Sequence, residues 1–565
     1  MSRQSSRTPW WHLYVPKLYT VLRGGYSPSL FRSDALAGLT VAIVAIPLAM
    51  ALGIASGATP DKGIITAVVA GFLISALGGS RVQIGGPTGA FVVVVYNVIG
   101  QHGYDGLLIA TMMAGILLLI AGASRLGTWI KYIPQPVITG FTAGIAVIIF
   151  SSQVKDFFGL EIEKVPGLFL EKWQVYWGAR DSLNIDALGI SSAALVFIVV
   201  LRKYFPHLPA FLLAVVLASF AVVVFNLPVV TIGSAFGELP HSLPMPRLPE
   251  GITVARIIEL FPSAFTIAFL AGVESLLSAV VADGMINSRH RSNCELVGQG
   301  VSNFISPLFG GLPATGAIAR TVTNIRSGGK TPVAGMMHAV FIMIAMYFLA
   351  PLASYIPLAV LASILIVVAW NMSEHERIRH LMRAPFGERL VLVLTFVLTV
   401  AVDLTVAIEV GVVLAAILFM HQMAEHTNFI EEDVDDFGKP KQKPEEALPE
   451  NIVSYRLRGP LFFGVGPRLL DVVEQLNPAP KVFILRLGLV PMIDASGEAA
   501  LRAFLDSCKK KGIFVIFSNL QPQPRRILKH MGLLDQEGQD FMFSADYQDG
   551  VRIARERTAL IASKK

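Results

Sequence analysis

Long apolar stretches separated by short polar segments occupy the first three-quarters of the chain. A helix needs about 20 apolar residues to cross a bilayer, and fewer where it is broken or buried in a bundle. By that measure the pattern predicts about fourteen spans, near residues 34–55, 62–79, 84–100, 105–123, 130–152, 187–201, 208–227, 257–282, 295–310, 313–326, 332–351, 355–371, 388–403 and 405–424. The expected fold class is a polytopic α-helical membrane protein.

Two of these apolar regions are interrupted by glycine and proline, at residues 85–91 and 313–318, and both interruptions contain Thr-Gly-Ala. Proline removes a backbone donor and pushes the preceding residue towards an extended form. In a membrane, broken backbone survives only where it is buried in protein or lines a cavity. Two such breaks in corresponding places of two halves point to a transporter's binding site. The alternative is a pair of unrelated helix starts, because Thr-Gly-Ala alone is common.

The basic residues predict how the chain is threaded through the membrane. They cluster after every second span, at Arg81, Arg125–Lys131, Arg202–Lys203, Arg289–Arg291, Arg326–Lys330 and Arg377–Arg389. The positive-inside rule makes that face cytoplasmic and places both termini there. Seven spans per half is an odd number, so the two halves must be inverted repeats. Segments 153–186 and 228–256 become the two long external loops.

The composition supports the same division of the chain. Only 15% of residues are charged, against roughly 25% in an average soluble domain. The net charge of +6 comes mostly from basic residues beside apolar spans, and we expect no nucleic-acid partner. We expect a cytoplasmic N-terminal segment at 1–33, a transport domain at 34–426, a linker at 427–450 and a cytoplasmic domain at 451–560.

The C-terminal region has the pattern of a small α/β domain. Strands are predicted at 452–457, 481–487 and 513–517, helices at 497–511 and 524–531, and short further strands at 461–463 and 541–543. Strands that alternate with helices give an open sheet covered by helices.

Several motifs together resemble the sulfate permease (SulP) family of anion transporters. They are residues 45–51 (AIPLAMA), 86–90 (GPTGA), 274–277 (ESLL) and 328–331 (GGKT), followed by a C-terminal domain similar to the STAS domain. Residues 280–285, 295–300 and 368–374 look most like the bacterial C4-dicarboxylate carriers of that family. The resemblance implies a core domain (spans 1–4 and 8–11), a gate domain (spans 5–7 and 12–14), a homodimer and elevator-type movement.

The two breaks supply the candidate substrate site. Helix N-termini aim free N–H groups and positive dipole ends at one point, which suits an anion. Thr88 and Thr315 are expected to be N-caps, and small residues allow close approach of the backbone. Arg320 offers a counter-charge, with a snorkelling arginine as the alternative. The predicted substrate-binding residues are Thr88, Gly89, Ala90, Phe91, Thr315, Gly316, Ala317, Ile318, Ala319 and Arg320.

Three further residues are candidates for coupling and regulation. Glu274 lies among apolar residues in mid-span with Ser278 one turn on, so the pair could carry a proton or sodium. The alternative for Glu274 is a structural, hydrogen-bonded carboxyl. Ser496 lies where related STAS proteins carry a phosphorylated serine, and its alternative role is an ordinary N-cap. A cytoplasmic partner of this domain is also expected.

The sequence therefore predicts a secondary active anion transporter of the cell inner membrane rather than an enzyme. Proton-coupled uptake of C4-dicarboxylates such as succinate or fumarate is the leading prediction, and sulfate or bicarbonate transport, with sodium coupling, is the alternative. A nucleobase carrier and a membrane-tethered signalling protein are the remaining ones. No catalytic residue, cofactor or metal is predicted, because no motif for one occurs and Cys294 and Cys508 fit no metal or disulfide spacing.

Overall fold

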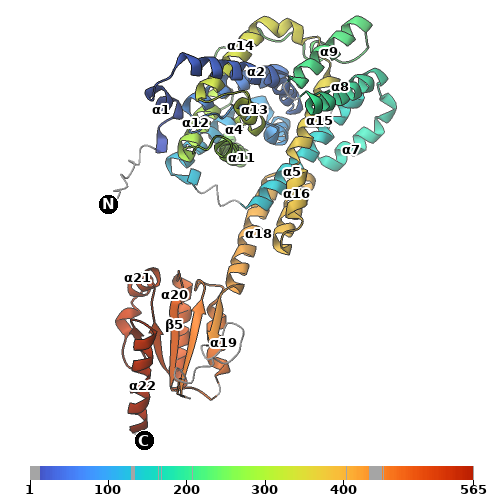
Figure 1. Ribbon diagram of the computed structural model, residues 1–565. Helices are drawn as coiled ribbons and strands as arrows, with labels where there is room; N and C mark the ends of the chain where they lie inside the picture. Colours follow the sequence, from blue (N-terminus) through green and yellow to red (C-terminus); the bar gives the residue numbers. More distant parts are fainter. Residues whose placement is uncertain are drawn as a thin grey trace. The chain divides into compact units, whose positions relative to one another are not determined.

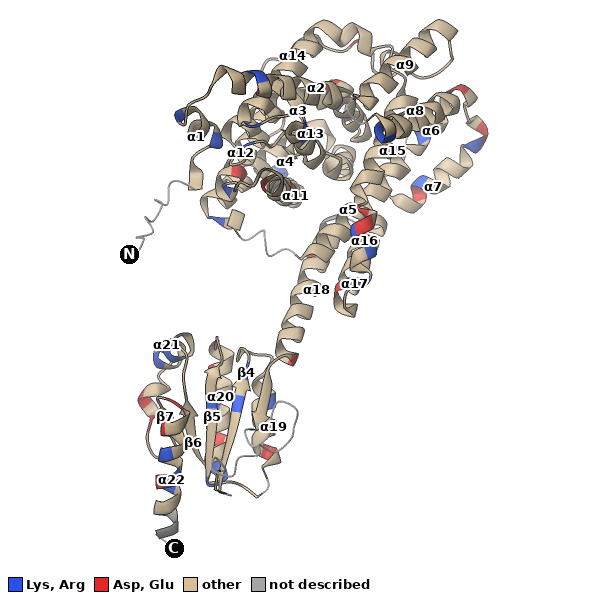
Figure 2. Cartoon of the chain, viewed as in Figure 1, with Lys and Arg blue, Asp and Glu red and all other residues tan. Residues whose placement is uncertain are grey.

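The computed structural model describes residues 13–128, 134–162, 165–166, 168–205, 208–402, 404–431, 448–449, 451–476 and 478–563. Residues 1–12, 129–133, 403 and most of the predicted linker lie outside that description. The chain divides into two compact units, Met1–Val412 and Val413–Lys565. The first is helical and the second is built around a sheet (Figure 1). Charged side chains are sparse over the long helices and frequent over the sheet unit (Figure 2).

Each of the fourteen predicted spans contains helix. The helices are α2 (Pro28–Ala55), α3 (Pro60–Leu77), α4 (Val92–Ala123), α5 (Gln135–Ser152), α8 (Ile185–Tyr204), α9 (Ala210–Phe225), α11 (Val254–Ile286), α12 (Ser292–Ile305), α13 (Ile318–Arg326), α14 (Pro332–Ala353), α15 (Leu358–Met372), α17 (Phe386–Ala401) and α18 (Leu404–Glu425). Spans three and four share α4, which turns at Gly103 with a φ of 73°. Nine helices of the described residues are long and apolar enough to cross a membrane, which confirms a multi-pass membrane protein.

Short helices connect the long ones, and the first span is longer than predicted. The connectors are α1 (Lys17–Arg23), α6 (Val154–Phe158), α7 (Phe169–Gly178), α10 (Ile232–Phe236) and α16 (His375–Leu381). Helix α2 contains the predicted span near 34–55 and begins six residues before it, at Pro28. The Ser27 hydroxyl accepts a hydrogen bond from the Leu30 amide at 3.3 Å, and proline suits the first helical position. Polar residues in this first turn hide the helix start from a hydropathy criterion.

The long helices pack in two groups. In one group α4 packs against α11 and α12, and α14 packs against α2 and α3. In the other group α5 packs against α15 and α17, and α8 packs against α9 and α15. Each group therefore combines helices from both halves of the sequence.

The two interrupted stretches lie side by side within the first group. Strands β1 (Gly85–Gly86) and β2 (Thr315–Gly316) pair antiparallel, with Gly85 opposite Gly316. The Ala317 amide adds a hydrogen bond to the Ile84 carbonyl at 2.8 Å. A 3₁₀ turn, η2 (Gly89–Phe91), then leads into α4, and α13 follows β2. The start of one helix therefore lies beside the start of the other.

The second unit is a five-stranded sheet with helices. The strand order is β3 (Asn428–Glu431), β4 (Ile452–Arg458), β5 (Val482–Leu489), β6 (Phe514–Ser518), β7 (Phe541–Ser544), and only β3 runs antiparallel to its neighbour. Its helices are α19 (Gly466–Gln475), α20 (Ala495–Lys510), α21 (Pro522–His530) and α22 (Tyr547–Ser563). Separate hydrophobic clusters, one around Phe483 and one around Ile484, bury alternate residues of the same strand.

Two details of this unit correct the sequence analysis. Residues 428–431 were predicted as linker but form β3. Each of these four residues has a pairing partner in β4. Residues 461–463 are not a strand, since Leu461 makes only an isolated bridge with Ile493. Helices α19 and α22 were not predicted.

Cys508 offers a test of this packing. It is fully buried on α20, and burial raises the pKa of its thiol from 9.0 to about 12. Because the thiolate is the reactive species, Cys508 should resist iodoacetamide at about pH 8 in the folded chain. Above about pH 9 the unfolded chain loses the thiol proton while the folded chain keeps it. Stability should therefore fall as the pH rises from 9 towards 12.

The measurement is peptide mass spectrometry after alkylation of the full chain. Ala503→Cys on the exposed side of α20 is the matched control and should react at an ordinary rate. Equal alkylation rates at residues 503 and 508 without denaturant would contradict this packing.

Gly316 tests the crossing of the two breaks. A Cβ at this position would lie 1.4 Å from the Gln83 Nε2, which is held by hydrogen bonds to the Ser275 carbonyl and hydroxyl. We expect Gly316→Ala to destabilise the chain by about 1–3 kcal/mol or more, as overpacking does. The check is the thermal unfolding temperature, with Gly100→Ala as the control because its Cβ meets no atom within 4 Å. Identical unfolding temperatures for the two variants would refute the close contact.

Candidate functional site

The candidate site lies at the crossing of β1 and β2, where two consecutive residues contact two charged groups. The Arg320 Nη2 donates a short hydrogen bond to the Pro87 carbonyl. The next residue, Thr88, donates its hydroxyl to the Glu274 Oε2 at 2.9 Å. Arg320 comes from the first turn of α13 and Glu274 from the middle of α11. One break therefore holds the cation and the carboxylate on neighbouring residues.

Arg320 is buried without a full set of partners. Arg320 is only 3% exposed. Its Nε and Nη1 have no hydrogen-bond partner among the described residues. Glu274 is close enough to interact with it electrostatically, but no ion pair within 4 Å joins them. Leaving guanidinium donors unpaired in an apolar interior is costly. An anion bound here would accept hydrogen bonds from the unpaired nitrogens of Arg320 and offset its positive charge.

Gly86 makes the position of Arg320 accessible. A Cβ on Gly86 would lie 2.4 Å from the Arg320 Nη1, and the φ of Gly86 is 148°, a conformation that disfavours other residues. The glycine therefore lets the guanidinium approach the backbone of the opposite break.

The two threonines do not play the equal roles that were predicted. Thr88 occupies the N-cap position of η2, but its hydroxyl bonds to Glu274 and makes no cap. Thr315 is not an N-cap, because it lies in β2 and Ala317 occupies the cap of α13. The Thr315 hydroxyl instead donates to the Ala271 carbonyl at 2.8 Å. Because Thr315 and Gly316 pair with β1, their backbone stays extended, and α13 begins only at Ile318.

The small residues of the first break face the second group of helices. A Cβ on Gly89 would lie 2.6 Å from the Met372 sulfur of α15 and 3.1 Å from Ile149 of α5. Ala90 and Phe91 are buried in the hydrophobic core of the same unit. Helix geometry leaves the first amides of both helix starts without partners in their own helices. On the other side, Ile318 and Ala319 form the first turn of α13.

Ser278 lies one helical turn from Glu274 on α11 but makes no hydrogen bond with it. Its hydroxyl is buried and donates to the Thr321 hydroxyl at 3.4 Å, and the same Thr321 oxygen accepts the Ile84 amide at 3.1 Å. Ser278 therefore supports the backbone of the first break. Among the described residues, no group of three or more His, Cys, Asp or Glu is placed to hold a metal.

A buried polar network behind the crossing was missed by the sequence analysis. The Ser275 hydroxyl donates to the Glu295 Oε1 at 3.0 Å and accepts from Gln83 and Gln299. The other carboxylate oxygen of Glu295 accepts the Gly79 and Ser80 amides at 2.8 and 3.1 Å. The signal was present, because Glu295 and Gln299 are one helical turn apart in a weakly polar span. The network fixes β1 from behind.

His338 is a second residue that was missed. It lies fully buried on α14, its two ring nitrogens have no partner among the described residues, and it interacts electrostatically with Arg320. A lone histidine in an apolar helix carries no spacing signal, so sequence reasoning assigned it nothing.

Ser496 of the second unit is exposed near the start of α20 but is not its N-cap. The cap is Asp494, whose carboxylate accepts the Gly497 amide at 2.7 Å. The predicted capping role of Ser496 is therefore wrong, since aspartate two residues earlier provides the acceptor. The hydroxyl of Ser496 remains open to solvent.

Known proteins resemble this chain over nearly its full length. The profile of the Sulfate permease family matches residues 31–395, and that of the STAS domain matches residues 443–545. The Bacillus subtilis (strain 168) protein YvdB, provisionally named a sulfate transporter, is 41% identical over 93% of this chain and 98% of its own. The bicarbonate transporter BicA of Picosynechococcus sp. is 29% identical over 89% of this chain and 91% of its own.

Solved structures agree on the fold. The transmembrane domain of a cyanobacterial bicarbonate transporter BicA has a TM-score of 0.61 and 29% identity, covering 69% of this chain and 98% of that one. The overall structure of SLC26A9 has a TM-score of 0.83 over 97% of this chain and 93% of that one, and at 19% identity it shows the fold alone.

These relatives are named for sulfate and bicarbonate, so they do not support the predicted special likeness to C4-dicarboxylate carriers. A permease moves its substrate without changing it, which agrees with the expectation that the chain is not an enzyme. The profile match spans well over half of the residues. This chain belongs to the sulfate permease family and carries a C-terminal STAS domain.

Proposed function

We propose that this protein is a secondary active transporter of a small oxyanion, with sulfate and bicarbonate as the leading substrates. The anion binds between the first turns of α4 and α13 and pairs with Arg320. The site comprises the residues that the sequence indicated, from Thr88 to Phe91 and from Thr315 to Arg320.

The observation that carries this proposal is the buried, incompletely paired guanidinium of Arg320. It lies in the first turn of α13, beside the break that leads into α4, so two helix N-termini add positive potential at the same place. An oxyanion offers acceptors for the unpaired Nε and Nη1 and for backbone amides together. A nucleobase has no negative charge to balance the arginine, which disfavours that alternative.

Sulfate and bicarbonate take precedence over C4-dicarboxylates because the names of the relatives point to them. YvdB, the most alike of the relatives reported above, is named for sulfate, and BicA for bicarbonate. The geometry at Arg320 suits any oxyanion, since a guanidinium pairs with carboxylate and sulfate alike. Succinate therefore remains a comparison ligand in the tests below.

We propose that the two helix groups are the core and gate that the family resemblance implies. The group with α4, α11, α12 and α14 holds the crossing, and the group with α5, α15 and α17 faces it. Gly89 lies against Met372 and Ile149 of the second group, where a side chain would obstruct sliding. This tight contact supports movement of one group along the other, with the anion carried at the boundary.

The arrangement of Glu274 supports coupling to a proton. Its carboxylate partly balances the charge of Arg320, so an arriving anion meets less net positive potential. A proton on Glu274 removes that competing charge, and the binding of proton and anion then favour one another. Sodium at Glu274 would act in the same direction. Ser278 was predicted to carry the ion together with Glu274, but its hydroxyl bonds to Thr321 instead. We therefore assign the coupling proton to Glu274 alone.

Three further parts of the proposal follow from the sequence pattern. The positive-inside distribution supports an inner-membrane location with both termini in the cytoplasm. The family resemblance supports a homodimer. The exposed Ser496 supports regulation through the STAS domain, because a phosphate there would meet the positive end of α20.

Replacing Arg320 tests the substrate site. Truncation of a buried charge pair typically costs about 2–5 kcal/mol, so Arg320→Ala should weaken anion binding by roughly 30-fold to several thousand-fold. Arg320→Lys should recover only part, since lysine lacks the planar fork of donors. Calorimetric titration of the purified chain with sulfate, bicarbonate and succinate measures the effect. Arg326→Ala on the exposed end of the same helix is the control, and unchanged affinity in Arg320→Ala removes the arginine from the site.

Replacing Glu274 tests the coupling. Glu274→Gln resembles the protonated form and should bind the anion, yet its net uptake should no longer respond to an imposed pH gradient. Uptake by the parent should rise as the external pH falls, because protonation favours anion binding. Proteoliposome uptake with pH and sodium gradients imposed separately makes the measurement. The control is Glu259→Gln, an exposed carboxylate on the same helix. Normal pH-driven uptake by Glu274→Gln excludes the proton role, and a strict sodium requirement in the parent favours sodium.

A further inference from the structure

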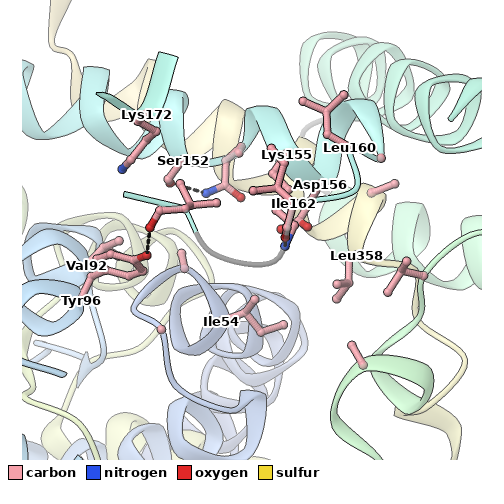
Figure 3. A pocket seen from close by; sticks show the side chains of 18 of the residues that line it. Ile54, Val92, Tyr96, Ser152, Lys155, Asp156, Leu160, Ile162, Lys172 and Leu358 are labelled. Atoms are coloured by element: carbon pink, nitrogen blue, oxygen red, sulfur yellow. Dashed lines mark hydrogen bonds between the residues drawn. The ribbon is translucent and has the colours of Figure 1, made fainter. Parts of the chain in front are cut away.

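A cavity of about 1190 Å³ lies between the two helix groups of the first unit. Figure 3 shows one wall formed by Val92 and Tyr96 of α4, and the opposite wall formed by Lys155, Leu160 and Lys172. Val92 directly follows η2, so the cavity reaches the helix start that belongs to the proposed anion site. It therefore lies next to that site, and described residues between 153 and 186 line its other side.

Lys172 of α7 lines this cavity and is 5% exposed. Its Nζ lies 5.8 Å from the centre of the Tyr96 ring, and Tyr96 itself is occupied by a hydrogen bond from its hydroxyl to the Val165 carbonyl at 2.8 Å. No carboxylate of the described residues forms an ion pair with Lys172. One turn further along α7, the buried Tyr176 hydroxyl has no hydrogen-bond partner within the described part of the chain.

Three other charged residues line the cavity, namely Lys155, Asp156 and Glu161, and Asp156 also interacts electrostatically with Tyr176 of α7. Lys155 donates to the Ile162 carbonyl at 2.6 Å and interacts electrostatically with its neighbour Asp156. Glu161 is exposed to solvent. Among the described residues, Lys172 has no ion-pair or hydrogen-bond partner for its ammonium group, and it is the more deeply buried of the two lysines that line the cavity. Burial lowers the pKa of its ammonium group, which indicates a site that lacks a negative partner.

We propose that Lys172 forms an outer anion site in this cavity, at which a small oxyanion binds before it moves to Arg320. A buried ammonium without a counter-charge is unfavourable, and an anion in the cavity offsets that cost. The positive-inside pattern places residues 153–186 on the outer face, so Lys172 is a buried cation on the side from which an incoming anion enters.

This inference rests on the proposed transport of a small oxyanion, but its site is separate. An ammonium acts as a compact point charge, whereas a guanidinium offers a fork of directed donors. The outer site should therefore capture sulfate and bicarbonate alike, and its contribution should appear as a higher local concentration of anion.

Direct occupancy can be measured by acylation of lysine in the purified full-length chain. A bound anion stabilises the ammonium form, and each unit by which it raises the pKa lowers the reactive amine about tenfold. We expect sodium sulfate at about 50 mM to slow acylation of Lys172 by about tenfold at about pH 8. Lys203 is the internal control, because its Nζ also lies over a ring, 5.4 Å from that of Tyr204, but on an exposed surface. Peptide mass spectrometry reports both rates in one sample, and bicarbonate is the second probe.

The same experiment in Arg320→Ala separates the two proposals. Protection of Lys172 that persists in this variant shows a distinct outer site, even if Arg320 proves to bind nothing. Three outcomes overturn the inference: protection no greater than at Lys203, a Lys172 that does not react in the absence of anion, and protection that disappears in Arg320→Ala.

Transport kinetics give the second readout. Lys172→Met keeps the length of the side chain without its charge, and it should raise the KM for external sulfate about tenfold with little change in kcat. Lys172→Arg should retain most of the parent's KM. Arg180→Gln removes an exposed cation from the same external segment and should leave the KM unchanged. A KM for folded Lys172→Met equal to that for Arg180→Gln contradicts the outer site, and if Lys172→Met does not fold, the acylation result decides.

Discussion

Backbone N–H and C=O groups inside a bilayer cannot form hydrogen bonds with water, so they must find partners within the protein. This constraint is strongest at the two helix breaks, where the helical hydrogen bonds are interrupted. The chain satisfies it by pairing the breaks with each other, through Gly85 and Gly316. Side chains complete the pairing: the Thr321 hydroxyl accepts the Ile84 amide, and the Asn324 amide donates to the Val82 carbonyl. Because these partners come from the other half of the sequence, neither break is satisfied alone. The inverted halves must therefore meet here for the fold to exist, and the site is a consequence of that meeting.

The arrangement of helices could be predicted because hydropathy and broken periodicity are local signals. Length and apolarity marked each span, and glycine with proline marked both interruptions. Other elements depend on distant partners. Strand β3 follows α18 closely and is only four residues long, and it becomes a strand because β4 offers an edge. Helix α2 begins six residues before the predicted span because Ser27 and Pro28 set its start, which hydropathy does not register.

The candidate site shows the same limit in finer detail. Arg320 and Glu274 could be singled out because an ionisable group in an apolar span is costly. Their separate attachment to Pro87 and Thr88 could not, since it depends on how the two residues after β1 meet α11 and α13. Thr315 has the same local sequence as Thr88, yet its hydroxyl turns to the Ala271 carbonyl. Equal motifs in inverted halves meet unequal neighbours, so sequence symmetry predicts where the site lies better than what each residue does there.

If both proposed sites bind the anion, it meets an ammonium group at Lys172 and a guanidinium group at Arg320. The different chemistry of these two cations determines which site selects the substrate. A site discriminates strongly when the wrong ligand leaves buried polar groups unpaired. The cavity beside Lys172 is large enough for water to satisfy whatever an anion does not, so a poor fit there costs little. Arg320 is held against Pro87 with Gly86 beneath it, and two of its nitrogens depend on the ligand. On this view, Lys172 attracts the anion, and Arg320 discriminates between sulfate and bicarbonate. The absence of a side chain at Gly86 determines how much space the anion has beside Arg320.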